Sequence, residues 1–219
     1  MPMNERDPPW REYASAPCYA HELDPLYRGL AAPDGDTRRD VMRWRKAERE
    51  RLQLLRKAVA AEQRAAALQS VLQQLEQLLQ NSEVTVLGAY WPIHQELDLR
   101  AWMRRQADAG MTIALPVIHA RNQPLGYSRW HPQGTMRRGP WGIAEPAADD
   151  WLEPQMLLAP LLGVDQHHYR LGNGGGYFDR SLAAAAPRPL AVGIGFHCAR
   201  IATIYPQVHD IPMDLVITG

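Results

Sequence analysis

Apolar residues between positions 36 and 80 recur at intervals of three and four, and this region contains neither glycine nor proline. Such spacing places the apolar side chains on one face of an α-helix, and the abundance of alanine, leucine and glutamine is typical of helices. The region is long for one globular helix, so we expect a break between Ala58 and Glu62. The apolar face comprises Leu68, Val71, Leu72, Leu75, Leu78 and Leu79.

The pattern changes after Asn81. Residues 84–90 form a short apolar run rich in β-branched side chains, which predicts a buried strand. Residues 97–109 predict a helix that ends at Gly110, and residues 111–117 predict the next strand. Two strands joined by a helix form a βαβ unit, which requires a parallel sheet.

Further strands are expected at residues 125–130, 156–162, 190–196 and 215–218, whereas residues 136–154 are interpreted as mostly loop. The sequence therefore predicts an α/β fold: a three-layer Rossmann-like domain with a mostly parallel sheet and a long N-terminal helix. This domain is expected to span residues 36–219. Residues 1–35 are interrupted by prolines but contain aromatic anchors, and they predict an irregular N-terminal arm.

Composition limits the class of protein. The 219 residues include 46% hydrophobic side chains, and 24 basic residues balance 24 acidic ones. That zero net charge argues against a nucleic-acid binder. Two cysteines are too few for a disulfide scaffold. Because no run of about 20 apolar residues and no signal-peptide core is present, we expect a cytoplasmic protein without a membrane partner.

The most informative segment carries four glycines within five positions, Gly172, Gly174, Gly175 and Gly176, directly before a predicted helix. Glycine lets the backbone approach a ligand closely, and successive N–H groups at a helix N-terminus can bind phosphate. The loop lacks the lysine of a Walker A motif and the third glycine of the dinucleotide fingerprint. By composition alone, it is either a phosphate cradle or a flexible connection.

The order of motifs resembles that of the 5-formyltetrahydrofolate cyclo-ligase family. The family signature runs roughly FDxxGxRLGxGGGYYDR, and the segment from Asp165 to Arg180 is similar to it. Other similar segments are YWPIHQELD at 90–98, LP at 115–116, GIAEP at 142–146 and HDIPMDLVIT at 209–218. The resemblance implies that ATP phosphorylates the formyl oxygen of 5-formyltetrahydrofolate, that N10 attacks the activated carbon, and that phosphate leaves to give 5,10-methenyltetrahydrofolate.

The resemblance also implies roles for individual residues, with ATP as co-substrate and Mg²⁺ as cofactor. Arg170 and Tyr177 are expected to be catalytic, and Asp165 and Asp179 to supply hard oxygen ligands for Mg²⁺. Glu96, Trp141 and Tyr177 are expected to bind the folate. The expected ATP-binding residues are Arg45, Arg49, Arg170, Leu171, Gly172, Asn173, Gly174, Gly175, Gly176, Tyr177 and Phe178.

Each of these residues also has a purely structural interpretation. The arginines belong to a strongly basic helix whose charges mostly face solvent, Glu96 is equally suited to cap the helix near Asp98, and Trp141 is suited to core packing. Val164 and His168 replace the family's usual phenylalanine and glycine. A non-catalytic or altered-specificity folate- or nucleotide-binding paralogue therefore remains the alternative. The expected assembly is a monomer or small homo-oligomer.

Overall fold

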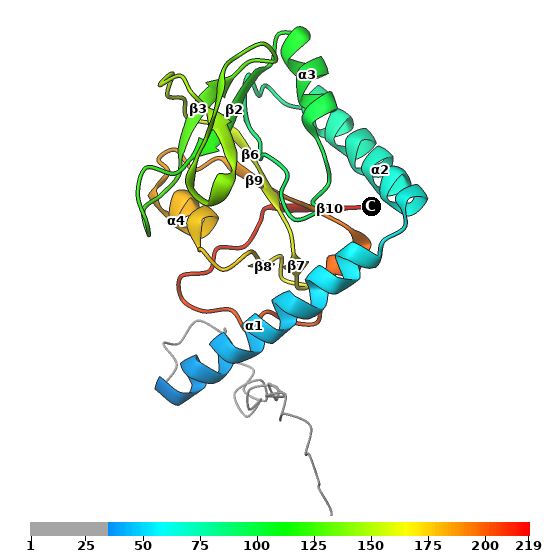
Figure 1. Ribbon diagram of the computed structural model, residues 1–219, viewed down its shortest axis with the longest axis vertical. Helices are drawn as coiled ribbons and strands as arrows, with labels where there is room; N and C mark the ends of the chain where they lie inside the picture. Colours follow the sequence, from blue (N-terminus) through cyan, green and yellow to red (C-terminus); the bar gives the residue numbers. More distant parts are fainter. Residues whose placement is uncertain (1–34) are drawn as a thin grey trace, which may run out of the picture.

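A six-stranded sheet forms the centre of the computed structural model, which describes residues 35–219 (Figure 1). Its strand order is β10-β9-β6-β1-β2-β3. Every neighbouring pair in this sheet is parallel except β2 and β3, which confirms the mostly parallel sheet. The strands are β1 (Val86–Gly88), β2 (Thr112–Val117), β3 (Gly126–Trp130), β6 (Met156–Pro160), β9 (Leu190–Gly195) and β10 (Leu215–Thr218).

Helices cover both faces of the sheet. Successive strand residues point to opposite sides, so each face presents apolar side chains that a helix can bury. Helices α2 (Ala61–Gln80) and α3 (Arg100–Asp108) lie on one face, and α4 (Tyr177–Ala184) lies on the other (Figure 1). On the first face, Leu158 packs in one cluster with Leu75 and Trp102. On the second face, its neighbour Leu157 packs with Leu182. The βαβ unit is confirmed, since α3 connects the parallel strands β1 and β2.

The predicted helical region at 36–80 contains α1 (Gly35–Ala58) and α2, which are separated by Val59 and Ala60. The break lies inside the stretch where the sequence favoured one. The buried residues of α1 are Val41, Arg45, Leu52 and Arg56. Their successive spacings of four, seven and four keep them on one helical face, and that face is unusual because it buries arginines.

Chain connections create a crevice at the middle of the sheet. From β1 the chain passes to β2 on one side, and later returns to β6 on the other side of β1. In open α/β sheets, ligands bind beyond the carboxyl ends of strands where the connections diverge in this way. The segments that follow β1, β2 and β6 are therefore the expected walls of a site.

Two small hairpins complete the fold. Residues 136–154, interpreted as mostly loop, contain the hairpin of β4 (Met136–Arg138) and β5 (Ala144–Pro146), with a 3-10 turn at Pro140–Gly142 between them. Strands β7 (Gly163–Val164) and β8 (Arg170–Leu171) pair immediately before the glycine loop, and a second 3-10 turn covers His197–Ala199. A strand of three residues is too short to show a recognisable alternation of apolar and polar side chains in the sequence.

The N-terminal arm predicted for residues 1–35 lies outside the described residues, apart from Gly35, where α1 begins. Among residues 35–219, no helix combines the length and apolarity that a membrane crossing requires.

Candidate active site

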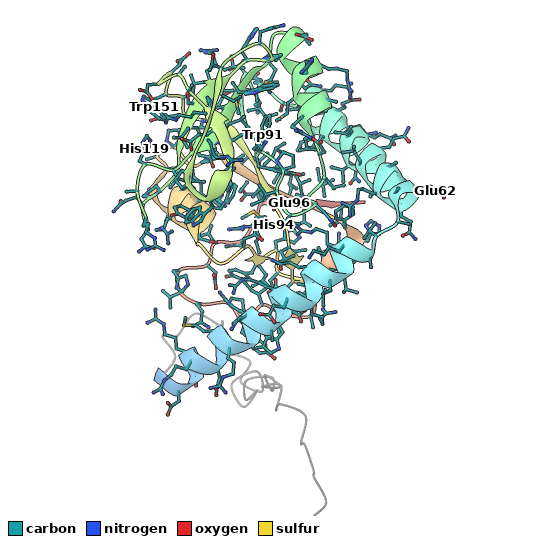
Figure 2. The ribbon with its side chains drawn as sticks, viewed as in Figure 1. Glu62, Trp91, His94, Glu96, His119 and Trp151 are labelled. Carbon is teal, nitrogen blue, oxygen red and sulfur yellow. The ribbon has the colours of Figure 1, made fainter. Side chains whose placement is uncertain are left out.

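A cavity of about 820 Å³ opens at the crevice in the sheet. Its walls come from α1, from the segments after β1, β2 and β6, from the turn around Trp141, and from the glycine loop with the start of α4. Glu96 and His94 lie near the centre of the molecule, between α1 and the sheet (Figure 2). This volume lies toward the upper end of the range usual for small-molecule sites.

The glycine loop lines this cavity as an open turn of backbone. Gly174 has a φ of 100° and Gly176, the residue before α4, has a φ of 62°. Both lie in the left-handed region that favours glycine. The N–H groups of residues 173–176 form no hydrogen bond with any other part of residues 35–219, and the first N–H groups of α4 lack helical partners, as at every helix start. The loop therefore presents several N–H donors to the cavity.

Arg49 lies against this loop from the side of α1. Its Nε donates to the carbonyl oxygen of Gly172 at 2.9 Å, and a Cβ placed on Gly174 would lie 3.4 Å from the guanidinium carbon. The two terminal nitrogens have no partner within residues 35–219. Burial lowers the pKa of Arg49, and the nearby charge of Arg45 lowers it further. Because both effects penalise the cation, an anion bound in the cavity would relieve them.

Arg45, one turn earlier on α1, also lines the cavity but has other partners. Its guanidinium donates to both carboxylate oxygens of Asp210 and to the carbonyl oxygens of Ile204 and Tyr205, at 2.5 to 3.1 Å. Both members of the ion pair are buried. The structure therefore uses Arg45 to hold the segment before β10, and leaves it little capacity for phosphate.

Arg170 and Asp179 form a second buried ion pair at the cavity wall, 2.9 Å apart. The guanidinium of Arg170 lies over the ring of Phe178, with 5.0 Å to its centroid. The Nε of Arg170 is buried without a hydrogen-bond partner in residues 35–219. A buried unsatisfied donor costs free energy, so this nitrogen is a candidate to receive an anion. Asp179 orients Arg170 and also accepts from the Ile211 N–H at 3.3 Å.

Asp165 does not line the cavity. One carboxylate oxygen accepts the N–H groups of His167 and Tyr169 at 3.0 Å, and the other accepts the Ile204 N–H at 3.2 Å. These contacts give Asp165 a structural role in a buried turn. Within residues 35–219, no cluster of three His, Cys, Asp or Glu side chains is arranged to hold a metal ion. The donor set of a protein-held Mg²⁺ is therefore not assembled from Asp165 and Asp179.

Two departures from the family signature, Val164 and His168, lie in this same turn and not in the cavity, whereas a third, Phe178 in place of the second tyrosine, lines the cavity. His168 has a φ of 65°, the backbone region for which glycine is favoured, which accounts for the usual glycine there. Its N–H donates to the Asp165 carbonyl, and its own carbonyl accepts from Met213. Val164 is buried beside Leu161 and Ala199. Both substitutions are therefore accommodated without changing the lining of the site.

Glu96 is the buried carboxylate of the cavity. One oxygen accepts the Ile93 N–H at 3.0 Å, and the other accepts the Asn173 amide at 3.4 Å. Burial raises the pKa of Glu96, against the lowering effects of the Ile93 hydrogen bond and the Arg56 charge. Glu96 does not cap α3, because Asp98 accepts the Arg100 N–H there. The capping interpretation is therefore wrong, and Asn173 links this carboxylate to the glycine loop.

Aromatic rings border the cavity on two sides. Trp141 is 62% exposed, so the interpretation as a core residue is wrong. It meets Tyr177 edge to face with 5.6 Å between the ring centroids, and Tyr90 and Trp91 lie on the side of Glu96. Flat rings flanking a polar wall suit a flat heterocyclic ligand. Leu171 lines the cavity while packing with Leu52 and Ile204 beneath it.

The structure brings together every residue predicted for the site except Asp165. It also adds residues that sequence reasoning missed: Tyr90, Trp91, Pro116, Ile118, Glu145, Gln207 and His209. Their common signal is position, since several directly follow β1 or β2, where an α/β sheet places its ligands. Gln207 had no such signal, because the 201–214 segment is irregular, whereas His209 opens the 209–218 segment that is similar to the family.

Comparison with known proteins gives consistent matches. A sequence profile of the 5-formyltetrahydrofolate cyclo-ligase family matches residues 41–219. The 5-formyltetrahydrofolate cyclo-ligase of Haemophilus influenzae is 25% identical over 178 residues, which is 78% of this chain and 95% of that protein. The Mycolicibacterium smegmatis protein of the same name is 31% identical over 142 residues, which is 59% of this chain and 71% of that protein.

Solved structures show the same fold. The 5,10-methenyltetrahydrofolate synthetase of Aquifex aeolicus is similar with a TM-score of 0.70 and 24% identity, over 80% of this chain and 89% of that one. The synthetase of Mycoplasma pneumoniae is similar with a TM-score of 0.64 and 20% identity, over 79% of this chain and 97% of that one.

Proposed function

The chain belongs to the 5-formyltetrahydrofolate cyclo-ligase family, and from that premise we propose that it converts 5-formyltetrahydrofolate and ATP into 5,10-methenyltetrahydrofolate, ADP and phosphate. One observation carries the assignment of the site. A single cavity places the open glycine loop and Arg49 next to a buried carboxylate, Glu96, and a hydrogen bond from Asn173 joins the two parts. A transfer between two substrates needs such a shared space.

The phosphates of ATP bind at the glycine loop and the start of α4. The N–H groups of residues 173–176 have no competing partner within residues 35–219, and the helix terminus favours negative charge. Arg49 contributes its two terminal nitrogens, and Arg170 contributes its buried Nε. Phosphoryl transfer depends mainly on positioning and on neutralising charge, and these donors supply both.

The pterin ring of the folate lies between the aromatic rings and Glu96. A carboxylate accepts two hydrogen bonds in one plane, which matches a flat ring edge that presents two donors. Trp141 and Tyr177 stand edge to face in the cavity wall, where they offer ring surface to the flat ligand. Tyr177 belongs to both halves of the site, because it also begins α4.

The reaction proceeds in two steps. The formyl oxygen attacks the γ-phosphorus and ADP leaves, a step in which Arg49, Arg170 and the loop N–H groups stabilise the transferred charge. N10 then attacks the activated carbon, the oxygen departs with phosphate, and N10 loses its proton. The formyl oxygen alone is a poor leaving group, and its departure as phosphate makes the ring closure favourable.

Mg²⁺ is proposed as the counter-ion of ATP and not as a resident metal. Mg²⁺ commonly binds through substrate phosphates and retained water with few protein ligands. That mode fits a site in which Asp165 is occupied by backbone N–H groups and Asp179 by Arg170. The protein's contribution is to present the phosphates.

The test is to incubate the purified protein with 5-formyltetrahydrofolate, ATP and MgCl₂, and to follow the methenyl product spectroscopically while measuring ADP release. Stoichiometric product and ADP are expected. Binding of both substrates without product would instead identify a non-catalytic paralogue. If product formed only from a related formyl compound and not from 5-formyltetrahydrofolate, the protein would have an altered specificity.

A further inference from the structure

Arg56 lies beneath Glu96 at the end of α1 and is only 3% exposed. One terminal nitrogen, Nη2, donates to the Leu161 carbonyl at 2.5 Å. The other, Nη1, is buried without a hydrogen-bond partner in residues 35–219 and lies 3.8 Å from Oε1 of Glu96. A buried guanidinium is costly unless it meets an opposite charge, and Glu96 is the nearest one.

The backbone that carries Glu96 is also held from this side. His94 and Gln95 have φ values of 45° and 61°, a conformation that costs free energy in residues other than glycine. Arg64, in the first turns of α2, donates to the Gln95 carbonyl at 2.7 Å and to the Arg56 carbonyl at 2.8 Å. The α1–α2 junction therefore binds the strained turn through Arg64, while Arg56 faces the carboxylate of Glu96.

We propose that Arg56 is a positioning residue that keeps the carboxylate of Glu96 charged and directed into the cavity, so that affinity for the folate depends on a side chain that does not touch it. Arg56 does not line the cavity, whereas Glu96 does. The identity of the ligand rests on the proposed function. The positioning itself rests on the contacts of Arg56 and Arg64.

The charges around Glu96 support this role. Arg56 is the foremost cation that lowers the pKa of Glu96, and Arg170 acts in the same direction more weakly. Tyr90 is fully buried and its pKa is raised, so it is neutral beside Glu96. Arg64 and Cys198 influence the pKa of Arg56 and not that of Glu96. Loss of Arg56 therefore removes the foremost charge that opposes burial and raises the pKa of Glu96 further, while the Ile93 hydrogen bond remains.

The experiment measures the dissociation constant of 5-formyltetrahydrofolate by calorimetry, without ATP, from pH 4.5, the ordinary pKa of a glutamate, to pH 8. The parent is expected to lose affinity below a midpoint pH at which Glu96 becomes protonated. Arg56→Gln should raise that midpoint by about one pH unit, because an opposite charge at this distance typically shifts a carboxyl by that amount or more. Affinity near the parental midpoint should fall about tenfold and recover at high pH.

Three further proteins complete the test. Lys57→Gln removes an exposed charge at the next position and should keep the parental midpoint. Arg56→Lys keeps the charge and should stay close to the parent, and Glu96→Gln should bind weakly at all pH values with no midpoint. A purely structural Arg56 would weaken binding equally at every pH.

The proposal is overturned if Arg56→Gln keeps the parental midpoint, or if neither Arg56 variant folds. Because ATP is absent, a parent that binds the folate yet forms no product contradicts the proposed reaction and leaves this inference standing. A parent that binds no folate overturns both.

Discussion

Arg45 and Arg49 lie one turn apart on α1, line the same cavity, and are expected to respond in opposite ways to the same substitution. Arg49→Ala should weaken ATP use and leave stability almost unchanged. Arg45→Ala should lower stability and change the KM for ATP much less. The difference follows from their partners, which the structure separates clearly.

For Arg45, alanine removes four hydrogen bonds and leaves Asp210 buried with one backbone donor, the Gln207 N–H. Breaking one side of a buried ion pair costs about 3–5 kcal/mol. In a chain of this size each kcal/mol lowers Tm by about 2–4 °C, so a fall of roughly 6–20 °C is expected.

For Arg49, alanine removes one hydrogen bond to a neutral carbonyl, worth about 1 kcal/mol. Its charge-assisted bonds to phosphate are each worth about 1.5–3 kcal/mol. Loss of the equivalent of one such bond should raise the KM for ATP roughly ten- to a hundredfold, and the KM for 5-formyltetrahydrofolate by much less.

Both variants are melted without ligands, and KM is measured for each substrate by following the methenyl product. The reasoning is refuted if Arg49→Ala keeps the parental KM for ATP in a protein that melts normally. It is equally refuted if Arg45→Ala melts like the parent and requires more ATP.

Three other substitutions test the loop, the turn and the buried acid. Gly174→Val should abolish ADP release with a stability loss of about 1–3 kcal/mol, because its φ of 100° strains a branched residue and the added side chain would lie against Arg49. Parental turnover in a folded variant would mean that the loop is only a connection. Asp165→Asn should lower Tm while the Mg²⁺ concentration for half-maximal rate stays constant, since the Asp165 carboxylate accepts backbone N–H groups. A large rise in the required Mg²⁺ concentration would instead identify Asp165 as a metal ligand. Burial raises the pKa of Glu96, so the folded state binds its proton more tightly and the protein loses stability as pH rises from the ordinary carboxyl pKa through the raised one. Glu96→Gln should therefore stabilise the protein more at pH 7.5 than at pH 4.5 in thermal melts, and an equal difference at both pH values would contradict the direction of the shift.

The local patterns of this sequence were sufficient for the elements of the sheet and for the open glycine loop. Continuous apolar runs marked β2, β6 and β9, because both faces of those strands are buried. Glycine at positions 174 and 176 signalled positive φ, a property of the residue itself. The hairpin of β4 and β5 was not predicted, because its three-residue strands are too short to show a period.

Only the tertiary structure decided which charged side chains serve the ligand and which serve the fold. Helical spacing correctly placed Arg45 and Arg49 on one face, but it carries no information about what packs there. Their partners, Asp210 and Gly172, lie 165 and 123 residues away in the chain. The same holds for Asp165, whose carboxylate suits a metal ion as well as it suits backbone N–H groups. A residue type sets what a side chain can bind, and folding sets which partner reaches it first.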